Sequence, residues 1–266
     1  MSDRLSLWQH FLARPNDDRS KIFGVAVLVA LVCAIIVSLT SISLKPLQDA
    51  NFAALRAARM AAMLDTLPGM RDVMEEAGID TLDSRLVDLT TGTFVEDADV
   101  AAFDPRAAKS DPAQSVAILP EKDIAGLRRR ANLAPVFLLE RQGEVLLLVL
   151  PVSGAGYQST LHAMLALDPD LRTIAALTIT EQGETPGLGA RIEDPSWQAL
   201  WAGKEAVDEA GNIVVTVVRG QATTPFEIDG ITGATITSNG VANMVRFWLG
   251  DDGFGPFLKR LRQEGL

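Results

Sequence analysis

The residues best suited to chemistry form one short stretch near the C-terminus. Residues 229–241 read Asp-Gly-Ile-Thr-Gly-Ala-Thr-Ile-Thr-Ser-Asn-Gly-Val, so glycines stand among several hydroxyl side chains. These hydroxyls belong to Thr232, Thr235, Thr237 and Ser238. Backbone N–H groups exposed by glycine, together with the positive end of a helix dipole, suit a phosphate. The stretch therefore predicts a phosphate-binding corner, although an ordinary turn before a capped helix has the same outline.

A strand and a helix are expected to position this stretch. Residues 213–218 are all β-branched and are bounded by glycines, which is typical of a buried strand. After the stretch, four apolar residues recur at helical spacing: Val241, Met244, Val245 and Trp248. We expect this helix to take Ser238 or Asn239 as its N-cap and to stop at Gly250.

The string Asp-x-x-Thr-Gly-Ala-Thr at residues 229–235 resembles a known recognition signature. Flavin transferases use that signature when they esterify FMN, through its phosphate, to the last threonine. The resemblance implies covalent FMN at Thr235. It also implies that a transferase recognises Asp229, Gly233 and Ala234 together with Thr235.

Three further segments resemble the NqrC family, a subunit of the Na⁺-translocating NADH:quinone oxidoreductase, namely residues 183–189, 197–204 and 247–258. The likeness runs from the N-terminal apolar segment to Leu266. The sibling family is the corresponding flavin subunit of the Rnf ferredoxin:NAD⁺ complex. That sibling shares the flavin motif but is not expected to have the run at 247–258, which favours the quinone reductase.

The resemblance to the NqrC family implies a redox carrier on the route from NADH to ubiquinone, in a translocase that exports Na⁺. The chain would be one subunit and not a complete enzyme, so no catalytic residue is assigned. Its implied partners are the other membrane subunits, a flavin transferase and the lipid bilayer. A membrane-tethered module that binds or senses FMN without a covalent bond is the alternative from another class. A hydrolase with a threonine nucleophile is disfavoured, because the sequence offers no general base adjacent to the threonine.

The resemblance also implies a flavin-binding surface assembled from several segments. The residues expected there are Tyr157, Gln158, Glu184, Thr185, Gly187, Leu188, Thr232, Gly233, Ala234, Thr237 and Ser238. The family usually has tryptophan in place of Gln158 and histidine in place of Gln182, so this chain departs from the usual aromatic cover of the flavin. Three tryptophans are another source of stacking, although core packing is their ordinary role: Trp197, Trp201 and Trp248.

Composition excludes several other functions. A net charge of −10 argues against nucleic acid, which demands a basic face. With Cys33 as the one cysteine, the chain alone forms no disulfide, zinc site or cysteine-ligated iron–sulfur cluster. The two histidines disfavour a protein-bound metal, and His162 in an apolar strand is interpreted as a core residue. The acidic residues at 96–99 lack the pattern of a calcium loop and are interpreted as a solvated face.

One segment is long and apolar enough to cross a membrane. Residues 22–39 are apolar except for Gly24 and Ser38, enough to span a bilayer core of about 30 Å. We favour a retained anchor over a cleaved signal peptide because no convincing cleavage site follows. Since Arg19 and Lys21 abut the apolar segment, the N-terminus is expected in the cytoplasm. Together with the resemblance to the NqrC family, this predicts a single-pass protein of the bacterial inner membrane.

The predicted organisation is an α+β domain behind a membrane anchor. A series of strands at 136–140, 145–152, 160–167 and 174–180, joined by short turns, predicts a mostly antiparallel sheet that includes 213–218 and carries flanking helices. The expected parts are a cytoplasmic segment at 1–21, a transmembrane helix at 22–41, a connecting helix at 42–69 and a periplasmic FMN-binding domain at 70–266.

Overall fold

The computed structural model describes most of the chain, namely residues 9, 14–16, 18–66, 83–96, 98, 100, 102–141 and 144–264. The chain divides into two compact units, Met1–Arg56 and Ala57–Leu266. Three predicted features fall outside the described residues: the turn that joins the predicted strands at 136–140 and 145–152, at residues 142–143; the acidic residues Asp97 and Asp99; and the end of the connecting helix at 67–69.

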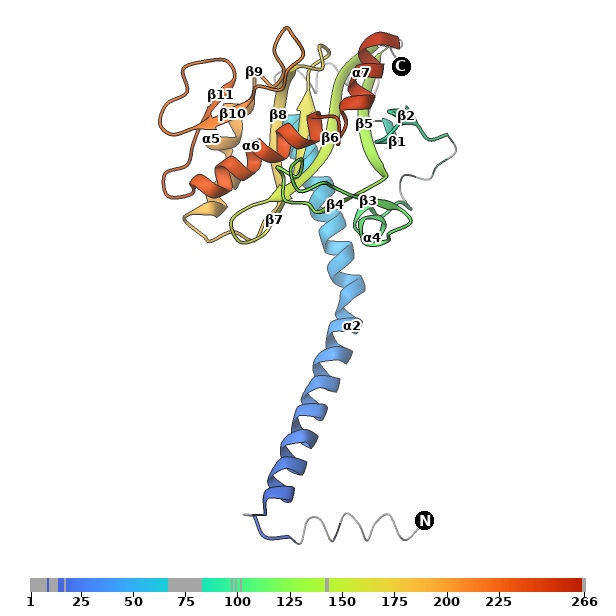
Figure 1. The fold of residues 1–266 in the computed structure, drawn as a ribbon, viewed down its shortest axis with the longest axis vertical. Coiled ribbons are helices and arrows are strands. Elements are labelled where there is room, and N and C mark those ends of the chain that lie inside the picture. The colour runs from blue at the N-terminus through green and yellow to red at the C-terminus, as the bar shows by residue number, and fades with distance from the viewer. Residues whose placement is uncertain are drawn as a thin grey trace. The chain divides into compact units, whose positions relative to one another are not determined.

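Helix α2 runs without interruption from Arg19 to Thr66 (Figure 1). It therefore joins the predicted transmembrane helix and most of the predicted connecting helix into one element. Its portion Arg19–Lys45 is the one candidate membrane span within the described part of the chain. Apolar side chains such as Phe23 and Val37 are exposed there, at 71% and 67%. An apolar helix that is exposed along this length suits a lipid environment.

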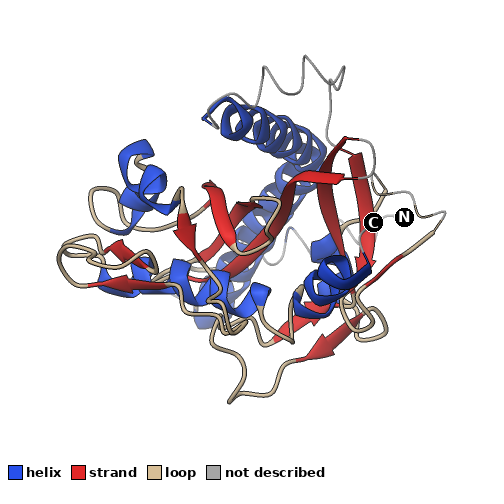
Figure 2. Cartoon of the chain, turned by 90° about the horizontal axis from the view of Figure 1, so that it is seen from above, coloured by secondary structure: helices blue, strands red, loops and turns tan. Residues whose placement is uncertain are grey.

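A seven-stranded sheet, whose neighbouring strands are all antiparallel, forms the second unit in the order β2-β1-β5-β6-β7-β8-β9. Its strands, red in Figure 2, are β1 (Asp83–Asp88), β2 (Thr93–Phe94), β5 (Leu133–Arg141), β6 (Glu144–Ala155), β7 (Thr160–Leu167), β8 (Thr173–Glu181) and β9 (Lys204–Glu205). The predicted α+β class and the antiparallel sheet are confirmed. Each predicted strand from 136 to 180 lies within one of these elements.

The remaining elements surround this sheet. Two small sheets are β3 (Ser115–Ala117) with β4 (Arg129–Ala131), and β10 (Thr216–Val218) with β11 (Glu227–Asp229). The helices are α4 (Pro105–Ser110), α5 (Pro195–Gln198), α6 (Thr235–Leu249) and α7 (Gly255–Glu264), with short 3₁₀ turns at Gly189–Glu193 and Ala199–Trp201.

The prediction that residues 213–218 form one strand of the main sheet is wrong. Only β10 is a strand, and it pairs in parallel with β11. The edge of the main sheet beyond β8 is occupied by β9. The residues before β10 form no regular ladder with the segment that follows β9. Instead, the N–H groups of Val214 and Val215 both donate to the carbonyl of Ala206. The β-branched run indicates extended backbone, but it carries no information about the partner strand.

Helix α6 packs on β6 through the predicted apolar stripe (Figure 1). All four stripe residues are buried: Val241, Met244, Val245 and Trp248. The indole of Trp248 also donates a hydrogen bond of 2.7 Å to the carbonyl of Ser153. A Cβ on Gly240 would stand 2.5 Å from the carbonyl oxygen of Ala155, so glycine permits the close approach of helix to strand.

The predicted boundaries of α6 are half right. Gly250 is the C-cap, as expected. The predicted N-caps Ser238 and Asn239 instead lie inside the helix, which begins at Thr235. The Ser238 hydroxyl donates to the carbonyl of Ala234, four residues back, a bond that serine makes within a helix. The start of α6 therefore lies directly at the threonine that the motif singles out.

Candidate functional site

Glu184 ties the loop after β8 to the loop between β6 and β7 and to α6. Its side chain is buried, at 5% exposure. Oε1 accepts hydrogen bonds from the N–H groups of Gln158 and Ser159, both at 3.0 Å, and from the Ser159 hydroxyl at 2.8 Å. Oε2 accepts from the N–H of Tyr157 at 3.1 Å and from the Thr237 hydroxyl at 2.6 Å. Both oxygens are thus fully engaged by neutral donors.

These donors keep the Glu184 carboxylate ionised. Burial raises its pKa, but hydrogen bonds from Thr237, Ser159 and the loop backbone outweigh burial, so the pKa lies below its ordinary value. Two glycines leave room for the carboxylate. A Cβ on Gly156 would lie 2.5 Å from Oε1, and one on Gly189 would lie 2.8 Å from Oε2. We call Glu184 and its donors Tyr157, Gln158, Ser159 and Thr237 the Glu184 knot.

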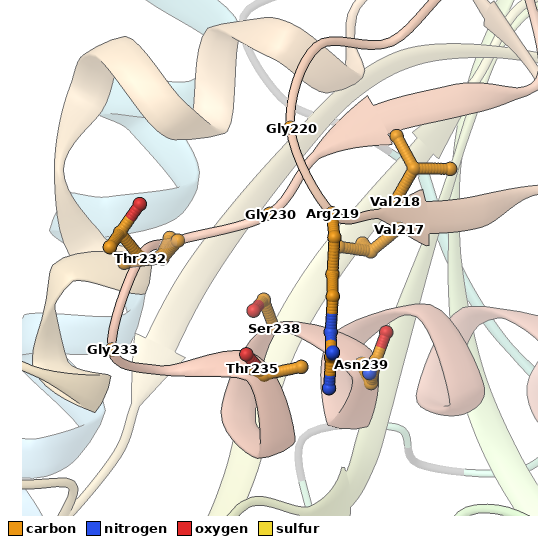
Figure 3. A pocket seen from close by; sticks show the side chains of 11 residues that line it. Val217, Val218, Arg219, Gly220, Gly230, Thr232, Gly233, Thr235, Ser238 and Asn239 are labelled. Carbon is orange, nitrogen blue, oxygen red and sulfur yellow. The ribbon is translucent and has the colours of Figure 1, made fainter.

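A cavity of about 360 Å³ opens beside the first turn of α6 (Figure 3), and no residue of the Glu184 knot lines it. Its walls come from the end of β10, the loop after β11 and α6: Val217, Val218, Arg219, Gly220, Gly230, Ile231, Thr232, Gly233, Thr235, Ser238 and Asn239. Gly233 has a φ of +83°, a conformation that glycine adopts without steric cost. The turn at Gly233 leads directly into α6, which begins two residues later.

Thr235 is the first residue of α6, and its side chain lines this cavity. The N-cap is Ala234, which offers no side-chain acceptor. Hydrogen bonding of the helix starts from the N–H of Ser238 to the carbonyl of Ala234. Within the described part of the chain, the N–H groups of Thr235, Ile236 and Thr237 therefore have no acceptor. N–H groups at a helix start that have no acceptor can donate hydrogen bonds to a bound anion.

Arg219 follows β10, and its side chain reaches the first turn of α6 beside Thr235 and Asn239 (Figure 3). It forms no salt bridge among the residues that the structure describes. Sequence reasoning missed this residue, since one arginine far before the motif has no recognisable spacing. The parallel pairing of β10 with β11 is what brings it to Thr235.

Exposed apolar side chains lie around the same turn. Tyr157, Leu188 and Ile236 are 65%, 48% and 59% exposed. Tyr157 is held near α6 because its N–H and the Thr237 hydroxyl share one oxygen of Glu184. Leu188 is close to the motif, since a Cβ on Gly233 would lie 3.3 Å from its Cδ2. Such side chains offer apolar surface to a flat aromatic ring, and Ile236 was not predicted.

The structure divides the predicted site residues into two groups. The cavity brings together Thr232, Gly233, Thr235 and Ser238. The Glu184 knot brings together Tyr157, Gln158, Glu184 and Thr237. The Thr237 side chain is buried and bonded to Glu184, and it does not line the cavity.

Thr185 and Gly187 shape the loop after β8. The carbonyl of Thr185 accepts from the N–H groups of Leu188 and Ala190, and Gly187 has a φ of +76°. Their part is therefore to form the turn that presents Leu188.

Asp229 has contacts of its own. Its carboxylate accepts a hydrogen bond of 2.6 Å from the N–H of Ala222, and its carbonyl accepts one of 2.8 Å from the Trp197 indole. These bonds fix the loop that carries the motif. Trp197, Trp201 and Trp248 are all buried, which confirms their interpretation as core residues. Among the described residues, no group of three or more His, Cys, Asp or Glu side chains is arranged to hold a metal ion.

Comparison with known proteins shows the family to which the chain belongs. A family model described as an FMN-binding domain matches residues 156–250, which contain both the Glu184 knot and the cavity. The NqrC-type subunit of the Na⁺-translocating NADH-quinone reductase from Vibrio alginolyticus is 41% identical over 96% of this chain and 100% of its own length. The same subunit from Pseudomonas aeruginosa is 39% identical over 93% of this chain and 98% of its own. The chain belongs to the NqrC family of Na⁺-translocating NADH-quinone reductase subunits.

Solved structures of this family support the fold. The crystal structure of Shewanella oneidensis NqrC matches with a TM-score of 0.69 at 33% identity, covering 79% of this chain and 99% of that one. The corresponding reductase subunit from Parabacteroides distasonis matches with a TM-score of 0.55 at 26% identity, covering 78% and 94%. As a family member with an apolar N-terminal helix, the chain is a membrane-anchored flavoprotein subunit whose cofactor is FMN.

Proposed function

We propose that this chain carries FMN as a phosphoester on Thr235 and serves as an electron carrier of a Na⁺-translocating NADH:quinone reductase. The single observation that carries the proposal is the placement of Thr235. It is the first residue of α6, its side chain lines a cavity, and the N–H groups around it have no acceptor within the described part of the chain. Such a corner accepts a phosphate group without the loss of any hydrogen bond between protein groups.

The surroundings of Thr235 fit the rest of the cofactor. Arg219 provides positive charge on the cavity side, while Tyr157, Leu188 and Ile236 provide exposed apolar surface for the ring. FMN, when bound, supplies the one- and two-electron redox chemistry that no side chain of this chain offers. The work of the protein is then to anchor the phosphate, to orient the ring and to limit its contact with water.

The proposal extends to location and partners. The charges at Arg19 and Lys21 favour a cytoplasmic N-terminus, so the FMN-binding domain at 70–266 would lie in the periplasm, after a cytoplasmic segment at 1–21. Its partners would be the other membrane subunits of the complex, with a flavin transferase needed for maturation. A reporter fused after Leu266 is expected to be active as a periplasmic protein, and activity confined to the cytoplasm would refute this orientation.

The decisive experiment measures the intact mass of the denatured full chain after coexpression with a flavin transferase. We expect the mass to include one FMN, and Thr235→Ala to remove it completely. Thr224→Ala, an exposed threonine outside the motif, is the matched control and should keep the flavin. Unmodified parent protein, or modification that survives Thr235→Ala, would contradict the proposal. Flavin that washes away on denaturation would instead support the module that binds FMN without a covalent bond.

A further inference from the structure

Arg219 is a charge whose partner is not found among the described residues. It lies directly after β10, is exposed, and forms no salt bridge within the described ranges. Yet its side chain does not extend away from the protein. It reaches along the cavity to the first turn of α6, with Thr235 and Asn239 on either side of its end (Figure 3).

Backbone donors at the start of α6 adjoin the same cavity, which Thr235 lines. Within the described part of the chain, the N–H groups of Thr235, Ile236 and Thr237 lack acceptors, and α6 is a helix of fifteen residues whose dipole favours negative charge at this end. Because the N-cap is Ala234, no side chain of the motif competes for these donors. A guanidinium beside them can form two parallel, charge-assisted hydrogen bonds to the oxygens of a phosphate group.

We propose that Arg219 is a binding residue for the phosphate group of FMN and holds it against the first turn of α6. This inference rests on the proposed function and deepens it, since it names a group outside the recognition motif. A phosphate esterified to Thr235 still carries one negative charge on its two non-bridging oxygens. Arg219 supplies the opposite charge, and the helix start supplies the uncharged donors. The motif and β10 are thus two halves of one anion site.

The role of Arg219 differs from that of Arg246, an arginine within α6. Arg246 lies in the last turn of α6 and is exposed, so its charge is far along the helix from the cavity. Arg246→Gln removes one positive charge from the same domain. It is therefore the matched control for Arg219→Gln, because both variants change net charge equally.

The first test uses the full chain with Thr235→Ala, so that flavin binds reversibly. FMN and riboflavin, which differ by the phosphate, are titrated against it by fluorescence quenching. Arg219→Gln is expected to weaken FMN binding roughly tenfold and to leave riboflavin binding unchanged, because the charge-assisted hydrogen bonds of the guanidinium to the phosphate are lost. Arg219→Lys should recover part of the affinity, and Arg246→Gln should change neither titration. If the Thr235→Ala chain binds FMN no more tightly than riboflavin, or if Arg219→Gln weakens both equally, the inference is overturned.

The second test uses the flavinylated protein. The phosphorus-31 resonance of the ester is expected to shift in Arg219→Gln and to stay in place in Arg246→Gln. An unshifted resonance in Arg219→Gln would overturn the inference while leaving the attachment at Thr235 intact. Parent protein without covalent flavin would instead defeat the proposed function itself. The two failures are therefore distinguishable.

Discussion

The two sides of the first turn of α6 satisfy their polar groups in opposite ways. On one side lies the Glu184 knot, where a buried carboxylate accepts five hydrogen bonds. On the other lies the phosphate corner, which we define as Arg219, the Thr235 side chain and the N–H groups of residues 235–237. Its backbone donors have no acceptor within the described part of the chain. Thr235 and Thr237 stand two residues apart in one turn, yet it is the Thr237 hydroxyl that bonds to the Glu184 carboxylate.

This difference separates structural from ligand-binding polar groups. Buried polar groups in native proteins are almost always paired, so a saturated buried carboxylate is what a stable core requires. Donors that face an open cavity are paired by water at little cost, and a ligand can replace that water. Glu184 therefore positions the loops of the site, whereas the phosphate corner is where we propose that the cofactor binds. Substitutions in the Glu184 knot should therefore lower the free energy of unfolding, and these are the largest effects on stability that we expect. Substitutions in the phosphate corner should instead affect the binding or attachment of flavin.

Removal of the Glu184 carboxylate should have the largest effect on stability. Glu184→Ala leaves five donors without their acceptor, of which the Thr237 hydroxyl is buried. We expect the free energy of unfolding to fall by about 3 kcal/mol, measured by urea denaturation of the detergent-solubilised chain with tryptophan fluorescence. Glu264→Ala, an exposed residue of α7, is the control and should change stability by less than about 0.5 kcal/mol. A loss as small as the control's would remove the distinction between the two sides.

The sequence predicted the main sheet well and the site only in part. The strands between 133 and 181 alternate or concentrate apolar residues in runs bounded by turn residues, so local pattern was enough. The prediction that residues 213–218 join the main sheet failed because strand pairing is decided by tertiary contacts, which no local pattern encodes. Arg219 was missed for the same reason, since it reaches Thr235 only through the pairing of β10 with β11.

Glu184 shows a second limit of sequence reasoning. The resemblance to the NqrC family indicated that this residue lies near the flavin, which stays a prediction. It did not indicate that both carboxylate oxygens would be occupied by the loop at 157–159 and by Thr237. Hydrogen bonds between segments far apart in the chain depend on the packed fold. The start of α6 was misplaced because Ala234 is a poor N-cap, and the usual preference for serine or asparagine pointed further along the chain.

Two neighbouring glycines should respond differently to alanine. A Cβ on Gly189 would lie 2.8 Å from Oε2 of Glu184 and 2.9 Å from the Thr237 hydroxyl, so Gly189→Ala is expected to cost about 2 to 3 kcal/mol. Gly187 has open space around it but a φ of +76°, so Gly187→Ala should cost about 1 kcal/mol. Urea denaturation measures both. Equal losses would mean that the Glu184 knot is no more tightly packed than the exposed loop.

The two threonines of the first turn should give crossed results. Thr237→Val keeps the shape but removes a hydrogen bond to a buried carboxylate, so unfolding should become easier by about 2 kcal/mol while flavin stays attached. Thr235→Val should leave the free energy of unfolding within about 0.5 kcal/mol and abolish covalent flavin. Stability is compared on flavin-free protein made without the transferase, and flavin content on protein made with it. Loss of flavin in Thr237→Val with native stability would place the Thr237 hydroxyl in the phosphate corner.

The smallest effect is a dependence on pH that belongs to Glu184. The pKa of its carboxyl is held below the ordinary value of 4.5, because hydrogen bonds to the ionised form outweigh burial. A group whose pKa is lowered by folding stabilises the protein above its unfolded pKa, and this stabilisation is lost as pH falls through the folded pKa. Glu184→Gln has no carboxyl to ionise, and its amide still accepts at one oxygen, so it should be less stable than the parent by about 1 kcal/mol at pH 7.

The gap between parent and Glu184→Gln should therefore narrow as pH falls from about 5 towards 3, measured by urea denaturation across that range. The pKa values of Asp170 and Glu227 are also lowered, but these residues are present in both proteins, so the difference between the two curves isolates Glu184. The donors to Glu184 are backbone N–H groups and hydroxyls, which do not titrate in this range. A gap that stays constant with pH would mean that the carboxylate contributes through its shape alone, and the Glu184 knot would then owe nothing to its charge.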